Sequence, residues 1–361
     1  MHVVINGRFL TQPVTGVQRY AHEVTRALDD LLDERSDVSL EILCPELNGP
    51  TPIYRNIAVR SVGSAAGHAW EQMVLPRAFK GDALFCPGNT APIASLLGKP
   101  RVVVCVHDLS YLYFPTAYSL PFRAVYNVLT PTIFRHADHV ITVSNSERTA
   151  ITARYPHITP RITAVQNGGL SEAVDTHAEG ASPDHPAPGY VLYVGSLSKR
   201  KNFPRMFEVA CDLARRRGQR TVFVGGTAAS LEQSDLTIDP DIADKIIFAG
   251  QINDTDRLVQ YYKGASVFMF PSLYEASPLP PIEAMACGVP VVSSTIPSLL
   301  ERCGDAAIYC DAESVASIAS QVEALLDDEN LAKNIRLKGR ERAKAFNWRN
   351  CAERTLELIV G

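Results

Sequence analysis

Short apolar runs alternate along the chain with segments in which apolar residues recur every three or four positions. Most of the runs are continuous, which is typical of strands that are covered on both faces. Residues 17–31 show the other pattern, with apolar side chains on one face of a helix. Strands that alternate with helices predict an α/β fold with parallel sheets. The predicted strands are residues 2–6, 40–44, 101–106, 139–144, 162–166, 190–195, 221–226, 245–250, 266–270 and 289–294.

The alternation breaks once, at residues 171–189, where three prolines and two glycines without an apolar period predict a linker. A chain of 361 residues is too long for one ordinary core, and the pattern restarts after the break. We therefore predict two Rossmann-like domains, residues 1–170 and 190–345, whose parallel sheets face a central ligand-binding cleft. Residues 346–361 have helical spacing, and we expect them to pack back onto the first domain.

Composition narrows the class of protein. Apolar residues make up 46% of the chain, and the formal net charge of −4 argues against a nucleic-acid-binding protein. No apolar run reaches the ~18 residues of a membrane-spanning helix, and the first residues do not have a signal-peptide pattern. The eight cysteines form no C-x-x-C pair, so we expect buried, reduced thiols in a cytoplasmic protein.

Glu275 and Glu283 stand at a junction that is suited to a ligand. Seven residues separate them, three of which are prolines. A predicted strand ends just before Glu275, and a helix is predicted to begin near Pro281. Free N–H groups and the helix dipole at such a start bind anions. Either glutamate alone fits an ordinary loop or helix-start acid, whereas the pair fits a ligand that carries phosphates and sugar hydroxyls.

Three consecutive cations, Lys199, Arg200 and Lys201, follow the first predicted strand of the second domain. Arginine binds phosphate through two hydrogen bonds, and lysine acts as a point charge. We expect these cations to face the same cleft as Glu275. The alternative is a solvated basic turn.

Two segments of the second domain, GSLSKRKN at residues 195–202 and the Glu-x7-Glu stretch at residues 271–294, resemble retaining GT-B glycosyltransferases of family 4. The resemblance is strongest to bacterial mannosyltransferase-like members that build polysaccharides such as O-antigen. It implies an enzyme that moves a sugar from a nucleotide-diphosphate sugar to a hydroxyl group without a bound metal. Segments of the first domain extend it over nearly the whole chain: residues 6–20, 104–115, 141–147 and 165–168.

The resemblance implies roles for single residues of the second domain. Glu283 would accept hydrogen bonds from the ribose, and Glu275 would contact the transferred sugar. Arg200 and Lys201 would hold the diphosphate as it leaves. The remaining donor-binding residues are Gly195, Ser277 and Leu279, the last two through backbone N–H groups. The family pattern Gly-Phe-Gly is replaced here by Ala276-Ser277-Pro278, and because Pro278 has no N–H, one phosphate contact is lost.

In the first domain the resemblance implies roles for Gly16 and His107. Gly16 would let the backbone approach the donor phosphate, and a simple turn before a helix is the alternative. His107 follows a predicted strand and would lie near the reacting sugar, the alternative being a structural histidine. Asn167 and Gly168 are predicted to form a turn without a catalytic role.

Residues 110–127 hold six Tyr or Phe, and the stretch from Arg101 to Arg161 holds six arginines against three acids, a local excess of three positive charges. One interpretation is an acceptor groove that contacts an anionic membrane surface. The other is an ordinary aromatic core beneath a mildly basic surface.

The sequence therefore predicts a metal-independent glycosyltransferase, with a GDP-sugar such as GDP-mannose favoured over a UDP-sugar and with a glycan or lipid-linked glycan as acceptor. We expect it in the cytoplasm or at the inner face of the membrane. A nucleotide-sugar epimerase, a phosphorylase and a non-catalytic nucleotide-sugar binder stay open. An oxidoreductase is disfavoured because no G-x-G-x-x-G follows residues 2–6 or 190–195.

Overall fold

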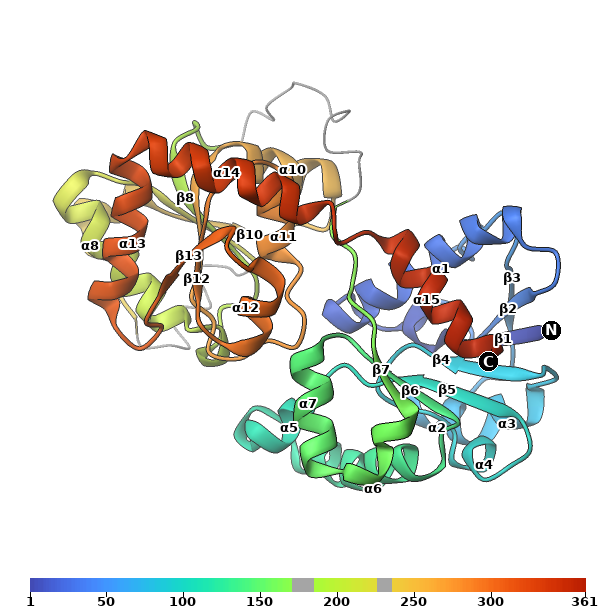
Figure 1. Cartoon of the computed structure of the whole chain (residues 1–361). Coiled ribbons are helices and arrows are strands. Elements are labelled where there is room, and N and C mark those ends of the chain that lie inside the picture. Colours follow the sequence, from blue (N-terminus) through green and yellow to red (C-terminus); the bar gives the residue numbers. More distant parts are fainter. Residues whose placement is uncertain (171–184, 226–235) are drawn as a thin grey trace. The chain divides into compact units, whose positions relative to one another are not determined.

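The computed structural model describes residues 1–170, 185–225 and 236–361, and the chain divides into two units (Figure 1). Unit 1 consists of Met1–Gly168 together with Trp348–Gly361, and unit 2 is Gly169–Asn347. Most of the predicted linker, residues 171–184, lies outside the described residues, as does the last position of the predicted strand 221–226.

Unit 1 is built on a parallel sheet, which has seven strands within the described residues, in the order β3-β2-β1-β4-β5-β6-β7. Apolar side chains from both faces of the central strands are buried, as the continuous apolar runs predict. The strands are β1 (His2–Asn6), β2 (Ser39–Cys44), β3 (Ala58–Ser61), β4 (Ala83–Cys86), β5 (Arg101–Cys105), β6 (His139–Thr142) and β7 (Ile162–Ala164).

The last helix of the chain, α15 (Trp348–Val360), belongs to unit 1 and packs against α1 (Gly16–Leu31). Its C-terminal carbonyls are held by Arg101, which donates from Nε to Ile359 O at 2.9 Å and from Nη2 to Leu358 O at 3.1 Å. The other helices of unit 1 are α2 (Gly67–Ala69), α3 (Leu75–Ala78), α4 (Ile93–Leu96), α5 (Ser110–Tyr113), α6 (Leu120–His136) and α7 (Asn145–Arg154), with a π-helical segment at Trp70–Val74 between α2 and α3.

Unit 2 repeats this architecture with a parallel sheet of six strands among its described residues, in the order β10-β9-β8-β11-β12-β13. The strands are β8 (Tyr190–Val194), β9 (Thr221–Val224), β10 (Ile246–Gly250), β11 (Ala265–Phe270), β12 (Val291–Ser294) and β13 (Ala307–Cys310). The helices are α8 (Phe203–Arg217), α10 (Thr255–Lys263), α11 (Pro280–Ala286), α12 (Pro297–Cys303), α13 (Val315–Asp327) and α14 (Glu329–Ala343).

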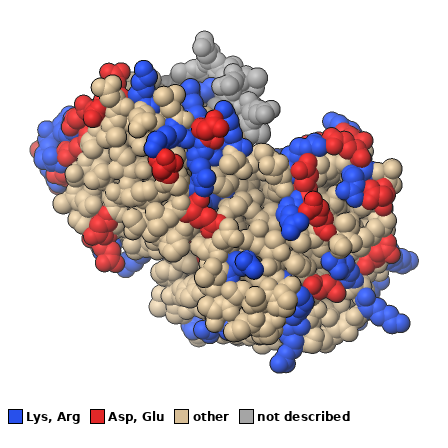
Figure 2. All heavy atoms as spheres, in the orientation of Figure 1, with Lys and Arg blue, Asp and Glu red and all other residues tan. Residues whose placement is uncertain are grey.

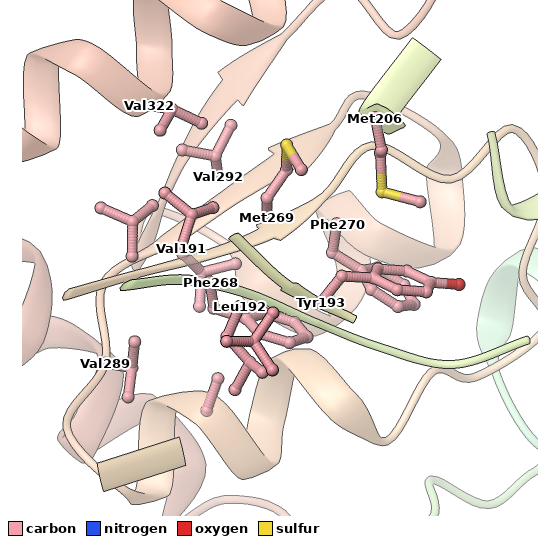
Figure 3. Packing of buried hydrophobic residues seen from close by; sticks show 14 of the residues in the cluster. Val191, Leu192, Tyr193, Met206, Phe268, Met269, Phe270, Val289, Val292 and Val322 are labelled. Carbon is pink, nitrogen blue, oxygen red and sulfur yellow. The ribbon is translucent and has the colours of Figure 1, made fainter. Parts of the chain in front are cut away.

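The core of unit 2 lies between the central strands and their helices (Figure 3). Val191 on β8 and Met269 on β11 are fully buried, and Met206 on α8 and Val322 on α13 pack into the same cluster. The rings of Tyr193 and Phe270 stack with their centroids 6.0 Å apart. This packing holds the ends of β8 and β11 beside each other.

The α/β fold class with parallel sheets is confirmed, and each of the ten predicted strands forms, with ends that differ by up to two residues. Three further strands, β3, β4 and β13, were not predicted. β3 is a largely exposed edge strand with little apolar character, whereas β4 and β13 are apolar runs of four residues, as short as the predicted strands β9 and β12.

Each sheet has one switch point, where strands are added to opposite sides of a first strand. In unit 1, β1 lies between β2 and β4, and in unit 2, β8 lies between β9 and β11. The loops that follow the two adjacent strands then diverge to opposite faces of the sheet, so a ligand can reach the carboxyl ends of the strands between them. The polar residues at these two places are therefore the candidates for function.

Candidate functional site

The switch point of unit 2 brings together the two segments that the sequence analysis singled out. A loop follows β8 and leads through a short 3-10 turn, Lys199–Lys201, into α8. A second loop follows β11 and leads into α11. Leu273 N donates to Arg200 O at 3.1 Å, so the two loops are joined directly by their backbones.

The side chain of Asn202 also connects these two loops. Its side chain is 1% exposed, and Nδ2 donates to Pro271 O at 2.9 Å and to Ala312 O at 2.7 Å. Its backbone has φ 65°, a left-handed conformation that asparagine tolerates better than most residues. The asparagine thus ties the end of the cationic turn to the loop that carries Glu275.

Lys201 and Glu275 form an ion pair between the two loops. The Nζ of Lys201 contacts both carboxylate oxygens of Glu275, and the two side chains are 15% and 6% exposed. Arg200 Nη1 donates to Tyr274 O at 3.2 Å. The structure therefore brings Glu275, Arg200 and Lys201 together, and in addition it pairs two residues to which the sequence analysis gave separate ligand contacts.

Glu283 lies in the first turn of α11 and is fully buried. Its Oε2 accepts a hydrogen bond of 2.9 Å from the hydroxyl of Tyr262 on α10. The carboxylate already accepts a hydrogen bond from a hydroxyl group, which is the interaction expected for a ribose. Tyr262 was not among the predicted residues, because its position gives no sign that it reaches α11.

The expectation of free N–H groups at the start of α11 is wrong. The first two helical residues, Pro280 and Pro281, have no N–H. The amides of Ile282 and Glu283 both donate to Leu279 O at 3.0 Å. The helix start therefore has no free amide of its own for a phosphate, and the backbone N–H groups of Ser277 and Leu279, which precede the helix, are the remaining candidates.

Arg302 on α12 is a further residue that the sequence analysis missed. It is fully buried and donates from Nη1 to Ser277 Oγ at 3.2 Å. Its guanidinium lies over the ring of Phe346, 4.3 Å from the centroid. A buried charge thus supports the loop in which Ala276-Ser277-Pro278 replaces the family's glycines.

Gly195, at the end of β8, is required by packing. Its φ is 150°, and a Cβ there would lie 2.7 Å from the hydroxyl oxygen of Tyr193. The hydroxyl of Tyr193 donates to Ser196 O at 2.8 Å, and burial raises the pKa of this phenol well above its usual value. Gly195 therefore lets the loop turn closely over Tyr193.

In unit 1, Gly16 and His107 have different surroundings. Gly16 is the exposed first residue of α1, and a Cβ there would meet no atom within 4 Å. His107, two residues after β5, is only 5% exposed. Its Nε2 lies 2.9 Å from Pro87 O, and burial lowers the pKa of the imidazole.

The basic excess between Arg101 and Arg161 has a structural cause in part. Arg101 caps α15, and Arg161 donates to the carbonyls of Phe134 at 3.0 Å and Ala137 at the end of α6. Both arginines donate hydrogen bonds to carbonyl groups at the C-terminal end of a helix, where the helix dipole also favours a positive charge. They are therefore not available as a surface patch.

The aromatic residues of segment 110–127 mostly pack on one another. The rings of Tyr118, Phe122 and Tyr126 stack in series, with centroids 5.0 and 4.1 Å apart. The exposed apolar side chains of α6 are aliphatic instead, because Leu120 is 75% exposed and Val128 is 59% exposed. Most of the surface over α5, α6 and α7 is uncharged in Figure 2.

The described residues contain no cluster of three or more His, Cys, Asp or Glu side chains that could hold a metal ion. All eight cysteines are buried, and none of them forms a disulfide bond. Among the helices in the described ranges, none is long and apolar enough to cross a membrane.

Comparison with known proteins covers both units. Residues 14–168 match the model of Glycosyltransferase Family 4, and residues 164–342 match that of Glycosyl transferases group 1. O-antigen chain mannosyltransferase B from Escherichia coli is 32% identical over 171 residues, which cover 46% of this chain and 45% of that protein. Glycogen synthase from Mycobacterium tuberculosis is 28% identical over 235 residues, or 63% of this chain and 55% of that protein. The matches thus span about half the length of these relatives.

Among solved structures, HepE from Anabaena in complex with UDP and glucose is similar with a TM-score of 0.71. The likeness covers 100% of this chain and 99% of that chain at 14% sequence identity. An identity this low shows a common fold, which is the GT-B fold.

Proposed function

The chain belongs to glycosyltransferase family 4, and on this premise we propose that it transfers a sugar from a nucleotide-diphosphate sugar to a hydroxyl group with retention of the anomeric configuration. The favoured donor is a GDP-sugar, with mannose or a related sugar, and the acceptor is a glycan or a lipid-linked glycan. The name of the E. coli relative, an O-antigen chain mannosyltransferase, supports mannose.

One observation carries this proposal: Arg200, Lys201 and Glu275 converge where β8 and β11 end in unit 2. Two cations suit a diphosphate, and a carboxylate suits the hydroxyls of a sugar. Both kinds of group are held by the backbone contacts between the two loops and by Asn202. The site therefore matches the two chemically different halves of a nucleotide-diphosphate sugar.

The Lys201–Glu275 ion pair implies an exchange of partners on binding. A phosphate oxygen competes with Glu275 for the ammonium of Lys201, and the carboxylate is then released to accept hydrogen bonds from the sugar. Arg200 and Lys201 next stabilise the negative charge that develops on the departing diphosphate. In this role they need no metal ion, and assays in the presence of EDTA check that point.

The transfer itself follows a front-face course. The bond between the anomeric carbon and the phosphate oxygen breaks, and a bond to the acceptor oxygen forms on the same face. The proton of the acceptor hydroxyl passes to the departing phosphate, so the step balances without a further reactant. In this proposal Glu283 holds the ribose, and the amides of Ser277 and Leu279 contact the phosphates. Gly16 and Gly195 are assigned further contacts to the donor nucleotide, and His107 is assigned a place near the reacting sugar.

A thermal-shift panel of GDP, UDP, dTDP and ADP tests the donor site. A nucleotide that binds only the folded chain raises the Tm. At a concentration of about 100 Kd, such binding raises the free energy of unfolding by about 2.7 kcal/mol. GDP is expected to give the largest shift, and a larger shift with UDP would favour the alternative of a UDP-sugar. If no nucleotide raised the Tm, the assignment of the donor site would be wrong.

Lys201→Ala is expected to weaken nucleotide binding about tenfold, because a hydrogen bond to a charged group contributes about 1.5–3 kcal/mol. Lys344→Ala is the matched control, since the Lys344 side chain is 72% exposed and pairs with Glu341, three residues earlier in the chain. Product formed from donor without acceptor would instead indicate an epimerase.

We also propose that α6 contacts a membrane surface at the acceptor side of the reaction. Leu120, Val125 and Val128 are exposed apolar side chains of this helix, and Arg123 lies among them. Binding to anionic vesicles that is lost in Leu120→Ser supports the contact, and unchanged binding would refute it. The enzyme would then work peripherally, at the cytoplasmic face.

A further inference from the structure

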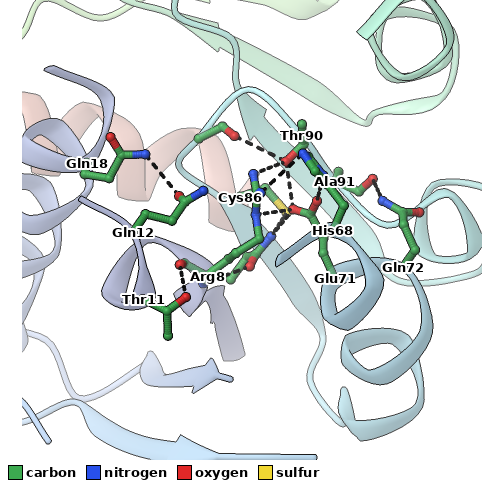
Figure 4. Close-up of polar contacts among 12 residues, drawn as sticks. Arg8, Thr11, Gln12, Gln18, His68, Glu71, Gln72, Cys86, Thr90 and Ala91 are labelled. Carbon is green, nitrogen blue, oxygen red and sulfur yellow. Dashed lines mark hydrogen bonds and ion pairs between the residues drawn. The ribbon is translucent and has the colours of Figure 1, made fainter. Parts of the chain in front are cut away.

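The switch point of unit 1 also contains a polar cluster, made of Asn6, Arg8, His68, Glu71 and Thr90, which we call the Glu71 cluster (Figure 4). Asn6 is the last residue of β1, Thr90 follows β4, and Glu71 lies in the π-helical segment. The cluster thus occupies the place in unit 1 that the proposed donor site occupies in unit 2.

Glu71 is fully buried at the centre of this cluster. Its Oε1 accepts hydrogen bonds from Asn6 Nδ2 at 2.6 Å and from Thr90 Oγ1 at 2.8 Å, and Arg8 Nε lies 3.6 Å away. Its Oε2 lies 3.4 Å from His68 Nδ1. Burial alone would raise the pKa of Glu71, but these partners outweigh it and lower the pKa. The carboxylate is therefore ionised.

Thr90 joins the two charges of the cluster. Arg8 Nη2 donates to Thr90 Oγ1 at 2.9 Å, so the single proton of the hydroxyl is directed at Glu71. The threonine side chain consequently has one defined orientation. Thr90 is also the last residue of a short loop, Pro87–Thr90, and its backbone N–H donates to Gly88 O at 2.7 Å.

This loop in turn holds His107. Asn89 Oδ1 accepts from the backbone N–H of His107 at 2.7 Å, and Pro87 O lies 2.9 Å from Nε2 of the ring. A carbonyl only accepts, so the proton is on Nε2, and the neutral ring keeps Nδ1 as an acceptor.

The loop also has a strained backbone. Asn89 has φ 56°, and among the described residues only Asn202 is a second non-glycine residue with positive φ. Each of the two asparagines lies at a switch point and fastens a loop that carries proposed site residues.

We propose that the Glu71 cluster positions His107: Glu71, Arg8 and Thr90 hold the Pro87–Thr90 loop so that Pro87 and Asn89 fix the place and the tautomer of the imidazole. These three are positioning residues, because they act on the reaction through His107. The inference deepens the proposed function, since it rests on the role given there to His107.

A purely structural ion pair is the alternative to this proposal. A buried ion pair is weak evidence for stability, because desolvation of its charges offsets their attraction, whereas loss of one partner leaves a buried charge and is costly. Changes at Arg8 or Glu71 would therefore disturb folding in either case. Thr90→Val separates the two, because it keeps both charges and the shape of the side chain and removes only the hydroxyl.

The experiment combines ¹⁵N NMR of the His107 ring, in the full-length chain, with the kinetics of GDP release from GDP-mannose. The wild type is expected to show a single tautomer with the proton on Nε2. Thr90→Val should give a mixture of tautomers and lower kcat about 10- to 100-fold, with KM for the donor nearly unchanged. Thr90→Ser keeps the hydroxyl and should restore both readouts.

Thr25→Val is the matched control, since Thr25 is a fully buried threonine of the same unit on α1 whose hydroxyl makes no hydrogen bond within the described residues. If Thr90→Val kept the wild-type tautomer and behaved like Thr25→Val, the positioning role would be refuted. If Thr90→Val did not fold, Thr90→Ala, which also keeps both charges and removes the hydroxyl, would be measured in the same way, and an unchanged His107 ring would refute the proposal.

The role of His107 itself is tested separately by His107→Gln. Wild-type turnover in this variant would contradict the role given to His107 in the reaction, while an altered ring signal in Thr90→Val would still show that the cluster positions it. A failure of the role given to His107 can therefore be distinguished from a failure of the positioning proposal.

Discussion

Buried ionisable side chains shape the chemistry of both units at the scale of single residues. In unit 2 a lysine and a glutamate neutralise each other, and a fully buried arginine supports Ser277. In unit 1 burial keeps His107 neutral, and the Glu71 carboxylate is kept ionised by its neighbours. A charge in such surroundings is stable only with its partners in place, so each of these residues is sensitive to substitution.

The neutral histidines predict how stability depends on pH. Burial lowers the pKa of His107, His22 and His139 below the ordinary value of 6.5. Between 6.5 and the lowered value the unfolded chain binds protons that the folded chain does not, so the free energy of unfolding falls as pH falls through this range. Urea unfolding at pH values of about 7.5 and about 5.5 measures the difference.

His107→Gln should reduce this pH dependence, because one of the three histidines no longer titrates. His157, which is exposed and on the same unit, gives the control variant His157→Gln. Equal pH dependence in the wild type and in His107→Gln would show that His107 binds its proton as readily in the folded chain as in the unfolded one.

At the scale of elements, loops after parallel strands are held by side chains that reach neighbouring loops. Asn202 joins the segment after β8 to those after β11 and β13, and Asn89 joins the segment after β4 to that after β5. Both asparagines have a left-handed backbone conformation, and their amide side chains reach the neighbouring loops. The loops of each switch point are therefore fixed by tertiary hydrogen bonds as well as by their own turns.

Asn202→Ala is expected to lower the free energy of unfolding by about 2–4 kcal/mol. It leaves the buried carbonyl oxygen of Pro271 and the half-buried one of Ala312 without their donor, and it places alanine in the left-handed region, which asparagine tolerates better. Asn202→Gly should recover about 1 kcal/mol of this loss, because glycine removes the backbone strain but not the missing hydrogen bonds. Equilibrium unfolding in urea measures both.

Asn330→Ala, on the exposed surface of α14, is the control and should change stability by no more than about 0.5 kcal/mol. A loss in Asn202→Ala as small as that of the control would mean that water replaces the asparagine as donor without cost.

At the scale of the whole molecule, the chain leaves unit 1 at Gly168 and returns to it at Trp348. Within unit 1 these two residues touch, since a Cβ on Gly168 would lie 2.5 Å from Trp348 Cγ. Within unit 2, Gly169 and Phe346 also lie side by side, because Gly169 N donates to Phe346 O at 3.0 Å. The outgoing and returning segments are thus held side by side in each unit.

Gly168→Ala should lower the free energy of unfolding by about 1–3 kcal/mol, because the added methyl group overlaps the indole ring. Trp348→Leu alone removes packing, but it should reduce the cost of Gly168→Ala, so the double variant is less destabilised than the sum of the single ones. Additive effects would show that the clash is relieved elsewhere. Gly49→Ala is the control, since a Cβ there meets no atom within 4 Å.

The family resemblance and most of the fold could be predicted because they depend on local pattern. The ten predicted strands are visible in the sequence as apolar runs. The Glu-x7-Glu segment and the cationic segment are each contiguous in the sequence. β3 could not be recognised in the same way, since it is a largely exposed edge strand without an apolar run, whereas β4 and β13 are apolar runs that the prediction overlooked.

The sequence by itself thus determined the order of strands and helices, the two-part α/β organisation and the residue types of the proposed donor site, because these follow from periodicity and from contiguous motifs. Only the tertiary structure decided which side chains meet. The pairing of Lys201 with Glu275, the absence of free amides at the start of α11, and the path from Glu71 through Thr90 to His107 join residues that are distant in sequence. Such contacts depend on strand order and loop geometry, which no local pattern encodes.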